Sequence, residues 1–285
     1  NILIINDMPG YGKVALAAML PILSHMGHNI YNLPTALMAA ITASVIPAVS
    51  GGLARRDRKG AARISGSALR ITALLSFPMG VGLFVLGVPI IRLLFASLNA
   101  ELAGSLLSTL GLTAIFSCVT LVCNSVLQAY GFVILPVIVM VLGGIVKIVT
   151  NYNLVGMAQI GIYGAPTGSV LCFALCLVLD LLIIARVIPH RPRFVPIFLK
   201  PFFASVVMGG AAWAVYGLMY RVLSHVPQGE TERVISWGGN ALATLGAIAV
   251  AMVVYVVLVV ALKAVSREDL ALMPKGEKIA RLLRL

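Results

Sequence analysis

The sequence predicts an all-α polytopic membrane protein with about seven transmembrane helices, and two observations carry this prediction. First, 60% of the 285 residues are hydrophobic and only 11% are charged, whereas soluble proteins are about 45–50% apolar and about 25% charged. Second, the apolar residues form long runs of roughly 20 residues, the length of helix that crosses a bilayer. These runs exclude an ordinary soluble domain, and they lack the alternation of a transmembrane barrel.

Seven apolar runs are long enough to span a membrane, and short polar gaps separate them. They lie at about 31–49, 71–95, 102–130, 132–155, 167–188, 202–222 and 241–265. Together they predict a transmembrane bundle over residues 32–265. The four cysteines lie inside these runs and the four histidines outside them, so we predict no metal site.

The basic residues concentrate in alternate gaps between the runs. They lie at Arg55–Arg63, at Arg186–Lys200 and in the tail from Lys263, whereas the gaps at 99–101 and 224–237 are acidic or balanced. Cytoplasmic loops of membrane proteins carry an excess of Lys and Arg. We therefore predict a cytoplasmic C-terminus and interpret the net charge of +12 as a topology signal, not as a nucleic-acid surface.

The two ends of the chain differ from the bundle. Residues 266–285 mix leucines with basic residues, which fits either an amphipathic helix at the cytoplasmic membrane surface or a solvated tail. Residues 1–31 suggest a strand at 2–5, a glycine loop at 6–13, a helix at 14–26 and a second extended piece at 29–32. That order predicts a short, truncated α/β segment.

The N-terminal stretch ILIINDMPGYGKVALAAMLPILSHMGHNIYNLPTAL, residues 2–37, resembles the start of bacterial pyridoxamine and pyridoxal kinases. The resemblance implies one edge of a pyridoxal pocket near residues 6–13. The later nucleotide-binding loops and catalytic aspartate of that family have no counterpart here. We therefore expect a kinase-like fragment without activity, no catalytic residues and no cofactor.

From residue 32 onward the chain resembles another family, the polysaccharide-export and lipid II flippases of the MOP superfamily, of the stage V sporulation protein B type. The matching stretches include NLPTALMAAITASVIPAVSGGLARRDRKGAARISGSALRITALLSFPMGVGLFVLGVPIIRLLF, VCNSVLQAYGFVILPVIVMVLGGIVKIVTNYNLV, GIYGAPTGSVLCFALCLVLDLL and the tail EDLALMPKGEKIARLLRL. The two resemblances overlap at NLPTAL, residues 32–37. We interpret the sequence as a chimera joined there.

The second resemblance implies a MATE-like architecture and a transport function without covalent chemistry. The bundle would be the second lobe of such a transporter, with 202–222 and 241–265 as two extra C-terminal helices. It would flip a lipid-linked oligosaccharide or a lipid II-like envelope precursor, of the undecaprenyl type, across the bacterial cytoplasmic membrane. Because alternating access needs two lobes, we expect this chain alone to be incomplete, with a separate first lobe or a second copy as its partner.

Two other functions stay open beside flipping. A MATE-type cation or drug antiporter would have the same fold, but its cavity would favour acids and aromatics, whereas these spans offer Lys147 and a single acid, Asp180. A membrane-embedded assembly partner would also fit a half-transporter. The intramembrane polar residues are the features on which these functions depend, because charges at bilayer depth usually face a cavity or a partner.

Lys147 and Asn151, four residues apart, share one helix face and are candidates to line a substrate cavity. Asn124 and Gln128 have the same spacing and the same candidate role. For both pairs, hydrogen bonding between helices is the alternative.

Asp180 and Thr167 are candidates for an ion or proton site. For Asp180 the alternative is pairing with Arg186, and Arg92 is expected to extend toward the membrane surface. Some members of the resembled family bind sodium with their seventh, eleventh and twelfth helices. Asn151 and Thr167 would correspond to part of that site, and we do not expect it to be complete, because kinase-like sequence replaces the seventh helix.

Overall fold

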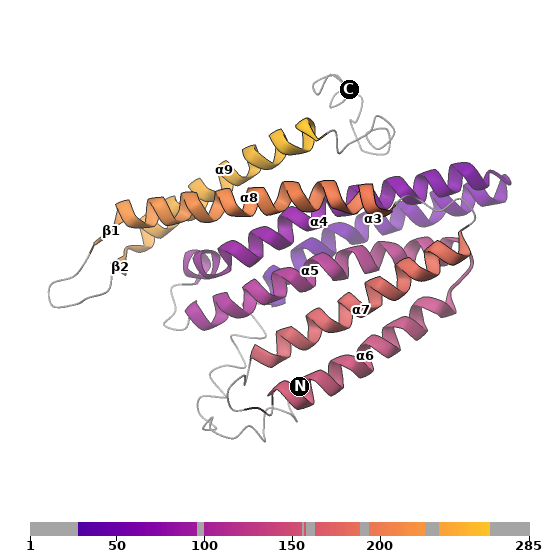
Figure 1. Ribbon diagram of the computed structural model, residues 1–285, viewed down its shortest axis with the longest axis horizontal. Coiled ribbons are helices and arrows are strands. Elements are labelled where there is room, and N and C mark those ends of the chain that lie inside the picture. The colour runs from indigo at the N-terminus through magenta and orange to yellow at the C-terminus, as the bar shows by residue number, and fades with distance from the viewer. Residues whose placement is uncertain are drawn as a thin grey trace.

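The computed structural model describes residues 28–95, 100–155, 157, 163–188, 194–225 and 234–262. Within these ranges the chain forms seven long helices (Figure 1): α3 (His28–Ala54), α4 (Arg58–Leu94), α5 (Ala100–Ala129), α6 (Ile134–Val155), α7 (Gly164–Val187), α8 (Phe194–Leu223) and α9 (Trp237–Ala261). All seven contain a segment long and apolar enough to cross a membrane. The prediction of an all-α polytopic membrane protein is therefore confirmed.

One short strand pair accompanies the helices in the described part of the chain. The antiparallel strands β1 (Ser224–His225) and β2 (Val234–Ile235) connect α8 to α9, with Ser224 opposite Ile235. Residues 1–27 and the tail from residue 263 lie outside the described residues. The α/β segment and the amphipathic tail therefore stay predictions.

The helices extend beyond the apolar runs that predicted them. Helix α4 begins at Arg58, whereas the predicted span began at residue 71. Helix α8 begins at Phe194, whereas the predicted span began at residue 202. With 37 residues, α4 is about 55 Å long, whereas the hydrocarbon core of a bilayer is about 30 Å thick. Hydropathy marks the part of a helix that lies in hydrocarbon, and backbone hydrogen bonding continues past it.

One expectation about the N-terminal segment is wrong. Residues 29–32 were expected to be extended, and in the structure they belong to the first turns of α3. No Gly or Pro lies between His28 and Leu33, so nothing in the local sequence stops the helix from beginning there. The boundary drawn between residues 31 and 32 therefore falls inside a helix.

The helices pack in the order α9, α8, α4, α5, α7, α6, and α3 lies against both α4 and α5 (Figure 1). The contact between α4 and α5 is the most extensive, and α6 packs chiefly on α7. The largest buried apolar cluster joins α3, α4, α5, α7 and α8, with Val49, Leu69, Val126, Ile184 and Ile197 among its members.

Pairs of glycines bring the backbones of α4 and α5 together. Gly80 and Gly87 on α4 face Gly111 and Gly104 on α5, and a Cβ on Gly80 would lie 2.6 Å from the carbonyl oxygen of Gly111. The seven-residue spacing is the same on both helices, as an antiparallel pair requires. Small residues allow such close approach between helices in a membrane, where apolar burial alone does not drive association.

The α3–α4 turn is polar and carries exposed basic residues. Its backbone follows the Schellman pattern, because Asp57 N–H donates to Gly52 O (3.0 Å) and Arg56 N–H donates to Leu53 O (2.9 Å). Arg56 has a φ of 61°. Asp57 then caps α4, its Oδ1 accepting from Gly60 N–H at 2.8 Å.

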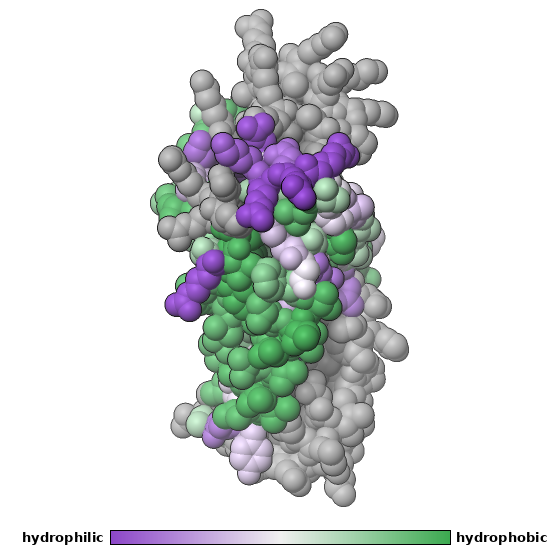
Figure 2. Space-filling model, turned by 90° about the vertical axis from the view of Figure 1, so that its right-hand side faces the viewer, coloured by the Kyte–Doolittle hydropathy of each residue, from purple (hydrophilic) through white to green (hydrophobic). Residues whose placement is uncertain are grey.

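We call the end of the bundle with this turn and the α5–α6 turn at Tyr130–Phe132 the basic end. Figure 2 views the molecule from the side of the basic end and shows hydrophilic residues gathered above a largely hydrophobic surface. The exposed basic side chains of the α3–α4 turn are Arg55, Arg56, Arg58 and Lys59.

The outward face of α6 is apolar. Its exposed side chains include Ile138, Val141, Ile145 and Ile148.

We predict opposite effects of the same substitution at two glycines. Gly104→Ala should lower the free energy of unfolding by about 1–3 kcal/mol, because the added Cβ overlaps the Val88 backbone. Gly82→Ala, where nothing lies within 4 Å of an added Cβ, should be neutral or stabilising by up to about 1 kcal/mol, from helix propensity. Thermal melting of the purified protein in detergent measures both, and equal effects would contradict the glycine-paired contact.

The cap on α4 gives a second prediction. Asp57→Ala should cost about 1 kcal/mol, because it removes the acceptor for the Gly60 N–H. Asp57→Asn removes the charge and keeps a capping oxygen, so its melting temperature should stay close to that of the unchanged protein. If Asn and Ala destabilise equally, charge and not capping is the contribution of this residue.

Candidate functional site

Three of the six predicted site residues are buried on α5, α6 and α7, and we call the packed group of these three helices the α5–α7 seam. Asn124 on α5, Asn151 on α6 and Asp180 on α7 have exposed fractions of 8%, 4% and 0%. Each has side-chain oxygen without a hydrogen-bond partner among the described residues. Buried polar atoms are nearly always paired in proteins, so these oxygens need an explanation. The other buried oxygens without a partner in the described part of the chain belong to hydroxyl groups of Ser, Thr and Tyr residues.

Asn151 lies in the contact between α6 and α7. Its Oδ1 is so close to Gly168 of α7 that a Cβ added to this glycine would overlap the oxygen. The backbone carbonyl oxygen of Lys147 would lie 3.5 Å from the same added Cβ. The Lys147 side chain is half-buried. Glycine at 168 thus brings the α7 backbone against a polar group of α6.

The structure separates Asn124 from Gln128 by depth. Asn124 is buried, whereas Gln128 is exposed near the end of α5, where its carbonyl accepts from Gly131 N–H at 2.9 Å. Gly131, with a φ of +89°, follows the last residue of the helix. Helical spacing predicted that both residues share a face, but it does not say how far along the helix the packed region extends.

The two ion or proton candidates do not converge. Thr167 Oγ1 donates to Tyr163 O of its own helix at 2.9 Å, and it precedes Asp180 by about 20 Å along α7. Asp180 and Arg186 form no ion pair, because six residues along a helix place them on different faces and Arg186 is exposed. The alternative of an Asp180–Arg186 pair is therefore wrong.

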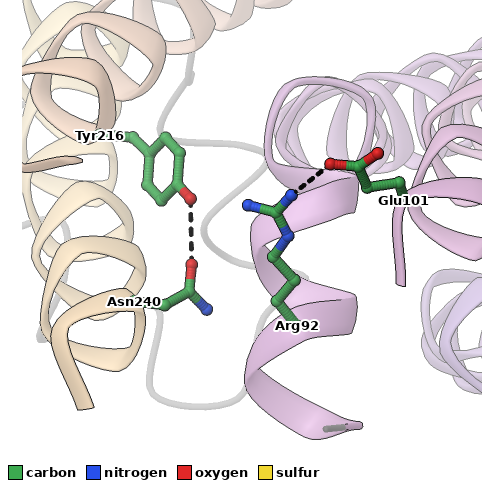
Figure 3. Close-up of polar contacts among 4 residues, drawn as sticks. All are labelled: Arg92, Glu101, Tyr216 and Asn240. Atoms are coloured by element: carbon green, nitrogen blue, oxygen red, sulfur yellow. Dashed lines mark hydrogen bonds and ion pairs between the residues drawn. The ribbon is translucent and has the colours of Figure 1, made fainter. Parts of the chain in front are cut away.

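A second group of polar contacts lies at the end of the bundle opposite the basic end. Arg92 on α4 forms an ion pair with Glu101 on α5, with Nη2 2.6 Å from Oε1. Beside it, Tyr216 Oη donates to Asn240 Oδ1 at 3.0 Å (Figure 3). Arg92 was expected to extend toward the membrane surface; its partner Glu101 is exposed, and the expectation stays a prediction.

Asn240 also connects α9 to α4. Its Nδ2 donates to Pro89 O at 3.2 Å, and Trp237 Nε1 donates to Leu93 O at 3.2 Å. Sequence analysis did not single out Asn240 or Tyr216. A buried Asn near the start of a predicted span was the available signal, but its partners on α4 and α8 are distant in sequence.

No group of three His, Cys, Asp or Glu residues that could hold a metal ion occurs in the described ranges. A family model described as lipid II flippase MurJ matches residues 21–229, well over half of the chain. The chain belongs to the MurJ family. A comparison with curated proteins yields no match. MurJ proteins are transporters and not enzymes, so the predicted transport class and the MOP-type flippase resemblance are confirmed at the level of the family.

The MurJ match includes α3 to α8 in full. It begins at residue 21, inside the stretch 2–37 that carries the kinase resemblance. The kinase resemblance and the chimera interpretation stay predictions.

The contact of Asn151 with Gly168 can be tested by a double-mutant cycle. Gly168→Ala should destabilise the MurJ chain by about 1–3 kcal/mol, because its Cβ overlaps Asn151 Oδ1. Asn151→Ala removes that obstacle, so the further cost of Gly168→Ala in this background should fall by more than half. Melting temperatures of the four proteins give the coupling, and additive effects would show that the two residues do not touch.

Proposed function

We propose that the chain takes part in flipping a lipid II-like precursor, a glycan carried on an undecaprenyl-type lipid, across the bacterial cytoplasmic membrane. Two observations support the proposal: the MurJ family match and a seam of buried polar oxygens within helices that cross a membrane. Unpaired polar groups at this depth are costly. They are best explained by a polar substrate or ion that they meet during transport.

The residues that we assign to substrate contact lie on α6, which carries Lys147 and Asn151, and on α5, which carries Asn124. Lys147 supplies a positive charge to pair with a pyrophosphate, and Asn151 and Asn124 supply amides for sugar hydroxyls. Asn151 is the observation on which this assignment depends, since it is 4% exposed and its Oδ1 is unpartnered among the described residues. We assign Gln128, exposed near the basic end, to the entrance of the path and Thr167 to an ion that accompanies transport.

We further propose that the basic end faces the cytoplasm and that a second lobe, or a second copy of this chain, completes the path. The four exposed basic residues of the α3–α4 turn support this orientation. The outward face of α6, which packs chiefly on α7, supports the second part. Its exposed side chains are apolar and suit either lipid or another helical lobe.

Flipping of a fluorescent lipid II analogue in proteoliposomes tests the proposal. The chain is reconstituted alone and together with the first six helices of a MurJ-family protein. A quencher added outside the vesicles reaches only the outer leaflet, so the analogue that has been flipped inward is measured as the fluorescence that the quencher no longer removes. We expect flipping from the pair and little from the chain alone. Absence of flipping from both preparations would contradict the proposal.

Lys147→Met should reduce flipping by the pair about tenfold or more, because a lost hydrogen bond to a charged group costs about 1.5–3 kcal/mol. Lys59→Met is the matched control, since Lys59 is exposed at the basic end, and it should keep the rate unchanged. Equal rates for the Lys147 variant and the unchanged protein would remove Lys147 from the substrate path.

A further inference from the structure

Asp180 is a fully buried carboxylic acid in the seam. It is 0% exposed, and neither of its carboxyl oxygens has a hydrogen-bond partner in the described part of the chain. Asn124 and Asn151 are amides and stay neutral at every pH. Asp180 differs from them because it can gain or lose a charge.

The level of Asp180 along the bundle follows from its neighbours. Cys176, one turn before it on α7, lies against Gly143 of α6, and its Sγ donates to Val139 O at 3.6 Å. Asp180 is therefore near the level of Val139. Lys147, eight residues farther along α6, is about 12 Å away along the helix axis, so the cation of the seam does not neutralise the carboxyl.

The titratable groups around Asp180 come from α5, α6 and α7, the helices packed together here. The thiols of Cys123 on α5 and Cys176 on α7 are near enough to interact electrostatically with the carboxyl. The remaining titratable or charged side chains of the three helices are Glu101, Cys118, Lys147, Tyr152, Cys172 and Arg186. No described group forms an ion pair or hydrogen bond with Asp180.

An isolated carboxylate cannot be kept charged in such a place. Transferring an ionised carboxylate to a medium of low dielectric, without a partner, costs far more than holding a proton on it. A metal or alkali cation does not fit as the compensating charge, because two thiols are poor ligands for hard cations and the Val139 carbonyl already accepts from Cys176. The arrangement suits the neutral acid.

We propose that Asp180 is a proton-binding site, protonated in the packed arrangement of α5, α6 and α7 and deprotonated when the seam opens to water. On opening, the carboxyl O–H bond breaks, the proton passes to water and the carboxylate is hydrated. On closing, the carboxylate takes a proton from water before it is buried. That this exchange accompanies flipping rests on the proposed function, whereas the protonated state of the packed bundle does not.

The first test measures the proton directly. The infrared spectrum of the purified chain at neutral pH should contain the carbonyl stretching band of a protonated carboxylic acid, which shifts in D₂O. Asp180→Asn should remove this band, and Asp57→Asn, at an exposed capping carboxylate, should keep it. Loss of carboxylate bands instead of the acid band in the Asp180 variant would overturn the proposal.

The second test uses stability. A group that is protonated in the folded state and ionised in the unfolded state makes the protein less stable as pH rises. Asp180→Asn should therefore melt above the unchanged protein by a margin that grows from mildly acidic to mildly alkaline pH. A margin that is independent of pH would overturn the proposal. Asp180→Leu provides the same comparison if the Asn variant does not fold.

The third test connects the site to transport. In the flipping assay with both lobes, Asp180→Asn should make the rate insensitive to pH, whereas Lys147→Met lowers the rate at every pH. If the Asp180 variant loses a dependence on sodium at constant pH, the site binds a cation and the proposal is wrong. Absence of all flipping would count against the proposed function, and the infrared band would still decide the protonation of Asp180.

Discussion

The backbone contact between α4 and α5 is the constraint on which the rest of the bundle depends. In lipid, a helix gains little by burying apolar side chains against another helix, so packing must come from close, complementary surfaces. Gly80 opposite Gly111 and Gly87 opposite Gly104 supply such a surface. Every other helix is positioned from this pair: α3 lies across both members, α8 and α9 pack on α4, and α7 packs on α5 and holds α6.

The two flanks of this central pair are held by different interactions. On the α4 side, hydrogen bonds cross between helices: Asn240 to Pro89, Trp237 to Leu93 and Tyr255 Oη to Leu74 O at 2.7 Å. On the α5 side, α6 is held to α7 by close packing at Gly143 and Gly168 and by one hydrogen bond, from Cys176 Sγ to Val139 O at 3.6 Å. The first flank thus has more hydrogen bonds between helices than the second, and α6 packs chiefly on a single helix. A moving element of the transporter is therefore expected on the α5 side.

Hydropathy predicted the existence of all seven helices, because a long apolar run has few alternatives in a membrane. Hydropathy placed the start of α4 thirteen residues late, because the first part of the helix contains Arg58, Lys59 and Arg63 and therefore does not belong to the apolar run. For the site, the cost of polar groups at bilayer depth selected Asn124, Asn151 and Asp180, which the structure buries, and their roles stay predictions. It also selected Gln128, which is exposed, because sequence spacing does not say which residues of a face the neighbouring helices cover. The Tyr216–Asn240 pair could not be predicted from the sequence, because the two side chains meet only when α8 and α9 are packed together.

Two buried asparagines, Asn240 and Asn151, differ in whether their side-chain oxygen has a hydrogen-bond partner. Asn240 is 2% exposed, and both ends of its amide have partners, Tyr216 and Pro89. Asn151 is nearly as buried, yet its Oδ1 has no partner among the described residues. An unpaired buried group costs about 1–3 kcal/mol, so a fold selected for stability alone would pair or replace it. The unpartnered amide and carboxyl oxygens of Asn124, Asn151 and Asp180 lie on α5, α6 and α7, whereas the hydrogen-bonded amide of Asn240 joins α9 to α4 and α8. The unpaired side chains of Asn151 and Asp180 are therefore the groups that gain most from contact with a polar substrate or with a proton.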